Sequence, residues 1–242
     1  MRKKRILRCE IAAAVLFVAF LALILLLKTV DVGTVDIRAV APDGTIIGTE
    51  TAPLGLSSLN QSLRAPYTPV WYTLTKLLGY ASMALAACFA LLGAYQLFSS
   101  RSLKKVDPDL YALAGAYALA AVFYVLFEVF VINYRPVILD EGLEASFPSS
   151  HTMLILTILG AAAVQCRLRL KNKALRRAVR AVFFVLMALM AVGRLLSGVH
   201  WFTDILGGAL LGLAIACAYS ACADTLLMRR RANRRKAARP RA

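Results

Sequence analysis

Long runs of apolar residues dominate the chain and alternate with short polar joints. A membrane-spanning helix needs about 20 consecutive apolar residues, within a range of about 17–25. Six runs are long enough to span, and the first, fourth and fifth of them are close to the lower limit. They are Ile11 to Leu27, about Val70 to Phe98, Leu110 to Ile132, Ser149 to Cys166, Val179 to Leu196, and Trp201 to about Met228. This pattern predicts an all-α fold, an integral-membrane bundle of six transmembrane helices.

The composition changes the picture in one respect, because the chain is strongly basic. Of its 242 residues 60% are hydrophobic, and the net charge is +16, whereas soluble domains are roughly 45–50% apolar. Most of the Lys and Arg lie in patches that touch the ends of apolar runs: Arg2 to Arg8, Arg101 to Lys105, Arg167 to Arg180, and Arg229 to Arg241. Basic residues gather on the cytoplasmic side of membrane spans and attract anionic lipid. We therefore expect a membrane as partner and no nucleic acid.

The basic patches also predict how the chain crosses the membrane. They precede the first run, join the second to the third and the fourth to the fifth, and follow the sixth. We expect both termini in the cytoplasm, in a multi-pass protein of the cell membrane whose other joints face outward. No small-residue cleavage pattern follows the first run, which favours a retained anchor over a signal peptide. Turn residues between Lys28 and Tyr67 allow a short hairpin in the first outer segment.

Ionisable residues gather at one predicted level of this bundle. Arg135 ends the third run, His151 begins the fourth, Arg194 lies near the outer end of the fifth, and His200 and Asp204 open the sixth. By the predicted orientation all five lie at the outer face of the membrane. Each alone has an ordinary explanation, since an interfacial arginine commonly snorkels. Together they indicate a functional site, because ionisable groups beside membrane spans are costly.

The spacing of these residues suggests a catalytic histidine. His200 and Asp204 are four residues apart, so they share a face of a helix that begins just before His200. We expect Asp204 to accept a hydrogen bond from one imidazole nitrogen, which fixes the tautomer and leaves the other nitrogen free to act as a nucleophile. His151 follows Ser149 and Ser150 at a helix start, where free backbone N–H groups attract anions.

Two arginines complete the predicted site. Arg135 and Arg194 carry planar, permanently charged donors that suit phosphate. An anion cradle, a nucleophile with its orienting carboxylate, and a separate acid fit phosphoryl transfer through a covalent phosphohistidine. We expect no metal and no other cofactor, because the arginines supply the positive charge and no carboxylate cluster fits a magnesium site.

Three segments resemble a known family. "NYRP", "PSSH" and "GRLLSGVHWFTD" resemble the three signature segments of the type 2 phosphatidic acid phosphatase family, integral-membrane lipid phosphatases related to the vanadium haloperoxidases. The family's third segment reads Ser-Arg, five residues, His, three residues, Asp, and the stretch from Gly193 to Asp204 has this spacing. The resemblance covers roughly Glu128 to Asp204. The flanking runs fit the family's six-helix layout.

The resemblance implies a role for each matching position. His200 would attack phosphorus, Asp204 would orient it, and His151 would protonate the leaving group. Arg135 and Arg194 would hold the phosphoryl oxygens. Ser149, Ser150 and nearby backbone amides would assist them in binding the substrate.

Three positions depart from the family pattern. Glu128 stands where the family has lysine, Gly193 replaces a serine, and Ser150 replaces a glycine. Glu128 cannot bind phosphate as a cation. Lys76, near the outer end of the second run, either supplies the missing charge or is an ordinary snorkelling anchor. The departures either retune the site, weaken it or mark a relative that does not catalyse.

The resulting hypothesis is a lipid phosphate or diphosphate phosphatase with its site at the outer face of the membrane. The substrate class is that of undecaprenyl diphosphate, phosphatidic acid and phosphatidylglycerol phosphate, and the sequence does not choose among them. Residues 1–69 would form an anchor and outer loop, 70–228 the phosphatase core, and 229–242 a basic cytoplasmic tail. The alternatives are a binding protein without turnover and a phosphotransferase to an alcohol. The oligomeric state is not readable from the sequence.

Overall fold

The computed structural model describes residues 2–139 and 142–237. Among them six helices are long and apolar enough to cross a membrane, which confirms the predicted helical membrane bundle. They are α1 (Arg2–Thr29), α3 (Pro69–Ser100), α4 (Pro108–Val129), α5 (Ser150–Arg169), α6 (Lys173–Leu196) and α7 (Phe202–Ala237). The final five residues of the predicted basic tail lie outside the described residues.

Several helices extend beyond the apolar runs that predicted them. α1 begins at Arg2, α6 begins at Lys173, and α7 continues to Ala237. The added residues are largely Lys, Arg and Ala, which are strong helix formers. The apolar runs therefore predicted only the part of each helix that can lie in a membrane. The helices α1, α6 and α7 continue beyond these runs and include residues of the basic patches.

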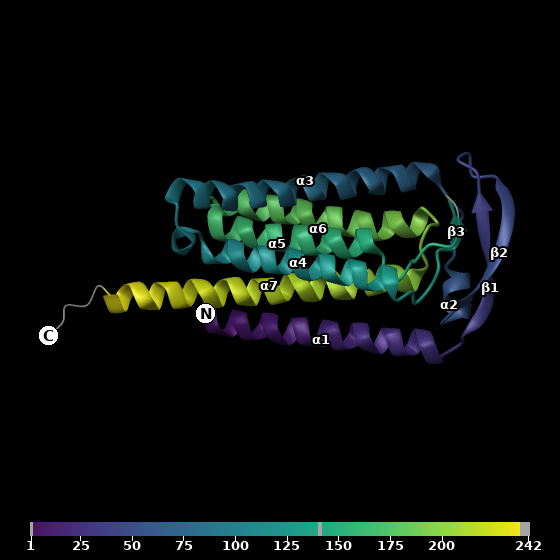
Figure 1. Cartoon of the computed structure of the whole chain (residues 1–242), viewed down its shortest axis with the longest axis horizontal. Helices are drawn as coiled ribbons and strands as arrows, with labels where there is room; N and C mark the ends of the chain where they lie inside the picture. The colour runs from purple at the N-terminus through teal and green to yellow at the C-terminus, as the bar shows by residue number, and fades with distance from the viewer. Residues whose placement is uncertain (1, 140–141, 238–242) are drawn as a thin grey trace.

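The helices form an elongated bundle in which α5 and α7 lie innermost. α7 packs along α1, α4 and α5, and α3 and α6 cover the other side of α5 (Figure 1). The N-terminus of α1 and the C-terminal part of α7 lie at the same end of the bundle (Figure 1). This arrangement agrees with termini on one side of the membrane, and the cytoplasmic assignment of that side stays a prediction.

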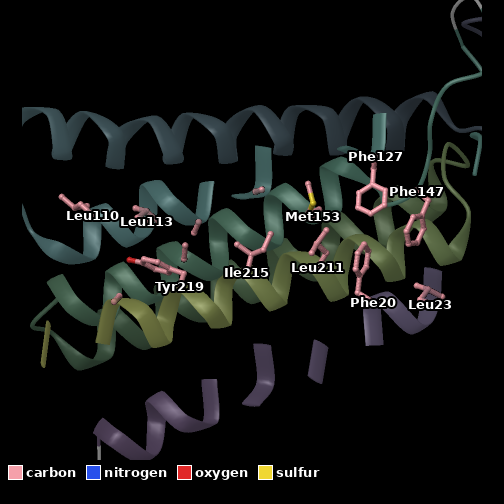
Figure 2. Close-up of a cluster of buried hydrophobic side chains, with 14 of the residues drawn as sticks. Phe20, Leu23, Leu110, Leu113, Phe127, Phe147, Met153, Leu211, Ile215 and Tyr219 are labelled. Atoms are coloured by element: carbon pink, nitrogen blue, oxygen red, sulfur yellow. The ribbon is translucent and has the colours of Figure 1, made fainter. Parts of the chain in front are cut away.

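The hydrophobic core is rich in aromatic rings near the end opposite the termini. Phe20 of α1 stacks on Phe147 with ring centroids 5.8 Å apart, and Phe127 of α4 meets Phe147 edge-on at 6.0 Å. Figure 2 shows these three rings together, with Met153 and Leu211 beside them. Phe147 immediately precedes the Pro-Ser-Ser-His stretch, so this packing fixes the start of α5.

A small sheet covers the same end of the bundle, beside the short helix α2 (Ser57–Ser62) (Figure 1). β1 (Gly33–Val40) and β2 (Ile46–Leu54) form the antiparallel hairpin allowed by the turn residues, and β3 (Val137–Ile138) joins β1 in parallel. The fold is thus mostly helical with one small sheet. Because β3 lies between α4 and α5, the sheet ties the first outer segment to the predicted catalytic loops.

Candidate active site

His200 lies in a short loop between α6 and α7 and is buried. Two residues earlier, Gly198 adopts a positive φ of 69°, and a Cβ there would lie 2.4 Å from the carbonyl oxygen of Pro66. Only glycine fits this backbone without strain. The close approach packs the His200 loop against the segment between α1 and α3.

The two ring nitrogens of His200 have different partners. Arg194 Nη2 lies 2.9 Å from Nε2, and Ser146 Oγ lies 2.9 Å from Nδ1. A guanidinium can only donate, so Nε2 accepts and the proton of the neutral ring is on Nδ1. Nδ1 then donates to Ser146, whose hydroxyl donates to Asp204 Oδ2 over 2.5 Å. Nε2 therefore carries the lone pair that a nucleophile needs, but this lone pair accepts from Arg194, whereas a free nitrogen was expected.

Asp204 therefore reaches the imidazole through a serine, whereas a direct hydrogen bond was expected. Its Oδ2 is 3.8 Å from His200 Nδ1, and α7 begins only at Phe202, so the two residues do not share a helical face. Asp204 sits in the first turn of α7, where its Oδ2 accepts the Trp201 N–H at 2.9 Å. Capping its own helix holds the carboxylate back from the ring. Asn133 donates to its other oxygen at 3.3 Å.

Arg194 is fully buried near the C-terminal end of α6. Besides His200, its guanidinium contacts the Thr75 hydroxyl at 3.4 Å and lies 5.7 Å from the centre of the Tyr72 ring. No carboxylate lies within 4.0 Å of it among the described residues. A Cβ at Gly193 would come within 2.7 Å of Thr75 Cγ2, so Thr75 of α3 occupies the space that a serine side chain would need.

Arg135 lies in the loop after α4 and makes an ion pair. Its Nη1 is 2.7 Å from Glu144 Oε2, and its backbone N–H donates to the Glu144 carbonyl at 3.0 Å. Its charge still reaches the histidine: burial lowers the pKa of His200 well below its usual range, and the positive charges of Arg194 and Arg135 lower that pKa further. The structure thus brings both predicted arginines to the vicinity of His200.

His151 occupies the first turn of α5 and packs against α3. A Cβ at Gly79 would lie 3.0 Å from its Cδ2 atom, and its Nδ1 is buried without a hydrogen-bond partner among the described residues. The electrostatic influence of His151 also reaches His200. The two histidines of the chain therefore belong to one neighbourhood.

The two serines before His151 are placed differently from each other. Ser149 is buried, and its backbone N–H donates to the Asp204 carbonyl at 2.9 Å. That amide is thus engaged within the protein, unlike the free cradle amides that were expected. Ser150 lines a small cavity that Ser146 and His200 also line. Of the pair, Ser150 has the more direct access to the histidine.

The PAP2 superfamily model matches residues 81–227 of the chain. The chain belongs to the PAP2 superfamily. No curated protein matches it. A transmembrane PAP2-type phosphatidylglycerolphosphate phosphatase from Bacillus subtilis is 19% identical, with 65% of this chain and 79% of that chain covered and a TM-score of 0.47. The structure of LpxE from Aquifex aeolicus is 23% identical, with coverages of 66% and 91% and a TM-score of 0.40.

Glu128, where the PAP2 signature has lysine, lies in the last turn of α4. It is exposed and lines the small cavity together with Ser146, Ser150 and His200. Lys76 Nζ lies over the Tyr72 ring at 5.4 Å, and the Arg194 guanidinium lies against the same ring. The residue at the mouth of this PAP2 site is therefore a carboxylate.

Sequence reasoning missed the residues that support the PAP2 signature from outside it. Ser146 links His200 to Asp204, and no local pattern pointed to it. Asn60 of α2 donates to Thr203 Oγ1 at 3.0 Å and accepts the Thr203 N–H at 3.2 Å. Thr203 lies in the first helical turn of α7, whose N–H groups lack partners within the helix. The segment between α1 and α3 thus takes part in holding the His200 loop, although its sequence suggested no such role.

Proposed function

We propose that this PAP2 protein is a metal-independent phosphatase of lipid phosphates or diphosphates. It acts at the outer face of the cell membrane through a phosphohistidine at His200. The substrate class is that of phosphatidic acid, phosphatidylglycerol phosphate and undecaprenyl diphosphate. A site at one end of a transmembrane bundle suits a substrate whose apolar tail stays in the bilayer.

The observation that carries this proposal is the position of the Arg194 guanidinium. It is fully buried, it has no carboxylate partner among the described residues, and it donates to Nε2 of His200 at 2.9 Å. A buried unpaired charge is costly. A phosphoryl group beside Nε2 would supply the missing counter-charge at the atom that forms the new bond.

The reaction takes place in two balanced steps. In the first, Nε2 of His200 attacks phosphorus, a P–N bond forms, the P–O bond to the lipid breaks, and His151 gives its proton to the leaving oxygen. In the second, water attacks the phosphohistidine, His151 takes a proton from that water, and inorganic phosphate leaves as the P–N bond breaks. Ser146 and Asp204 keep the Nδ1 proton oriented and stabilise the positive charge that develops on the ring.

Phosphate release from a panel of these lipids in detergent, with EDTA present, tests the proposal directly. Turnover that EDTA does not reduce is expected, because arginines supply the charge neutralisation. His200→Ala should lower turnover by about 10⁴-fold or more. Full activity in a folded His200→Ala protein would remove the proposed nucleophile.

A comparison of the two histidines sharpens this test. His151→Ala should lose activity mainly toward lipid substrates, whose alkoxide needs a proton, and much less toward p-nitrophenyl phosphate, whose leaving group does not. His200→Ala should lose activity toward both. Equal losses for both substrates in both variants would contradict the separate roles.

A binding protein without turnover is the second candidate, and Glu128 is the observation that favours it. A carboxylate in the cavity beside His200 repels a phosphoryl group. Glu128→Lys should raise turnover strongly if the native site is disabled, and Glu128→Gln serves as the control that removes the negative charge without adding a positive one. Measurable native turnover of any lipid in the panel would reject this candidate.

A further inference from the structure

A groove opens at the basic end of the bundle, far from His200, between α1, α5, α6 and α7. Arg167, which lines it, is 16 residues from His151 on the same helix, about 24 Å along the axis. The groove has a volume of about 440 Å³, within the range of about 300–1,000 Å³ typical of small-ligand sites. Its apolar walls include Val164, Phe184 and Met187. It is separate from the catalytic site.

The groove is polar at one end and apolar at the other. Three helices each contribute a polar residue at the basic end and an apolar one seven residues away, about 10 Å deeper into the bundle. These pairs are Arg167 and Gly160 on α5, Arg180 and Met187 on α6, and Ser220 and Leu213 on α7. Such a groove matches the shape of a phospholipid, whose charged head group lies at the interface and whose acyl chain points toward the membrane centre.

The charges at the polar end do not balance. Buried Asp224 pairs with Arg5 at 2.7 Å and with Arg167 at 3.0 Å, and Arg2 lies 3.7 Å away. One carboxylate thus faces three guanidinium groups. Arg180 adds a fourth, which makes no ion pair within the described part of the chain.

One of these guanidinium groups has an unused donor. Arg167 Nη2 is buried and has no hydrogen-bond partner among the described residues. A buried donor without an acceptor is rare in proteins and calls for an explanation. Excess positive charge with a free buried donor beside an apolar groove favours an anion that carries a hydrocarbon chain.

We propose that this groove binds an anionic glycerophospholipid from the leaflet at the basic end, which the charge pattern predicts to be cytoplasmic. The phosphodiester lies between Arg167 and Arg180, and one acyl chain runs along the groove past Gly160. Basic pockets between transmembrane helices on that side bind anionic lipid head groups in other proteins. The site does not depend on the phosphatase activity proposed for the opposite end.

Native mass spectrometry of the full chain released from detergent tests this, with phosphatidylglycerol and phosphatidylcholine of identical acyl chains as the two probes. Phosphatidylglycerol is a phosphodiester, so a phosphatase of terminal phosphates leaves it intact. We expect one tightly held phosphatidylglycerol and no such phosphatidylcholine. Arg180→Gln should weaken its binding about fivefold, since a basic residue near anionic lipid contributes about 1 kcal/mol.

Two further variants distinguish the groove from general surface charge. Arg177→Gln removes the same charge from α6 but lies outside the groove lining, and it should leave binding unchanged. Ala163→Leu fills the apolar wall without changing charge, and it should weaken binding. Equal effects of Arg180→Gln and Arg177→Gln would overturn the proposal. Displacement of the lipid by soluble glycerol 3-phosphate at equal concentration would overturn it too, since the site would then bind a free anion.

Discussion

The two ends of the bundle differ in whether a buried charged side chain has a partner of opposite charge. At the basic end, the buried carboxylate of Asp224 has Arg5 and Arg167 within 3.0 Å. At the opposite end, Arg194 is fully buried and its nearest partners are the imidazole of His200 and the hydroxyl of Thr75. The first arrangement is centred on an anion that the protein supplies, whereas the second has a cation for which the described residues supply no anion.

This contrast indicates that the ion pairs of Asp224 stabilise the fold, whereas the charge of Arg194 serves ligand binding. Removing one partner of a buried ion pair leaves a charge without compensation, so such pairs hold a fold together against substitution. Arg194 has no such pair among the described residues, so the fold gains little from its charge. The free-energy cost of burying the Arg194 charge is offset when a ligand provides a negative charge beside it. The contrast therefore predicts that substitutions at the two ends affect different measurements.

The largest expected effect is on the proposed catalysis at the His200 end. Arg194→Met should lower kcat/KM for lipid phosphate by about 10²–10³-fold, the usual effect of losing a donor to a developing negative charge. The thermal unfolding midpoint in detergent should stay the same or rise, because a buried unpaired charge is removed. Asp224→Asn should do the reverse, with about 3 kcal/mol of stability lost and activity per folded molecule retained. A loss of stability in Arg194→Met and a loss of activity in Asp224→Asn would together break the contrast.

The link between His200 and Asp204 should have a smaller effect. Ser146→Ala removes the hydroxyl that joins them, and we expect kcat to fall by about 10–100-fold, as for other groups that orient a reactive side chain. KM should change little, because Ser146 acts through the imidazole. Ser146→Thr keeps a hydroxyl and should recover part of the activity. An unchanged kcat in Ser146→Ala would mean that Asp204 acts without the serine.

The outer segment offers a third comparison, between two neighbours in α2. Asn60 is buried against Thr203, whereas Gln61 is exposed. Asn60→Ala leaves buried polar groups of α7 without partners, which costs about 1–3 kcal/mol, and loosening of the His200 loop should lower kcat several-fold. Gln61→Ala should change neither quantity. Matching behaviour of the two variants in melting and activity assays would show that α2 does not position the loop.

The smallest effect concerns the protonation of His200. Its pKa is held below the ordinary value of 6.5, so the ring stays neutral in the folded protein at pH values where the unfolded chain binds a proton. His200 therefore leaves stability unchanged above about pH 6.5 and lowers it as the pH falls further. Arg194→Met removes a nearby positive charge and should raise the pKa.

Nitrogen NMR can observe this titration, because the chain has only two histidines. In ¹⁵N-histidine-labelled protein, the His151→Gln background leaves His200 as the only signal. We expect the tautomer protonated on Nδ1, persisting below pH 6.5. Half-protonation at or above pH 6.5, or a proton on Nε2, would contradict the hydrogen-bond assignment.

The sequence predicted what depends on local pattern. Apolar length determined the six helices, and the spacing between Arg194, His200 and Asp204 located the residues that gather at the outer end. The Ser146 link was beyond its reach, because that serine lies 54 residues from His200 and 58 from Asp204 along the chain. The contact between Asn60 and Thr203 spans 143 residues. Only the packing of the loops brings such partners together, and no periodicity in the sequence indicates these contacts.

The packing of α1 along α7 has a consequence for how the protein is made. α1 is synthesised well before α7, its main neighbour, and Phe20 stacks on Phe147, which is also synthesised later. A nascent chain that stops before α7 holds a first helix without its main partner and lacks Asp204. The proposed activity therefore requires the insertion of α7, and shorter products should lack it.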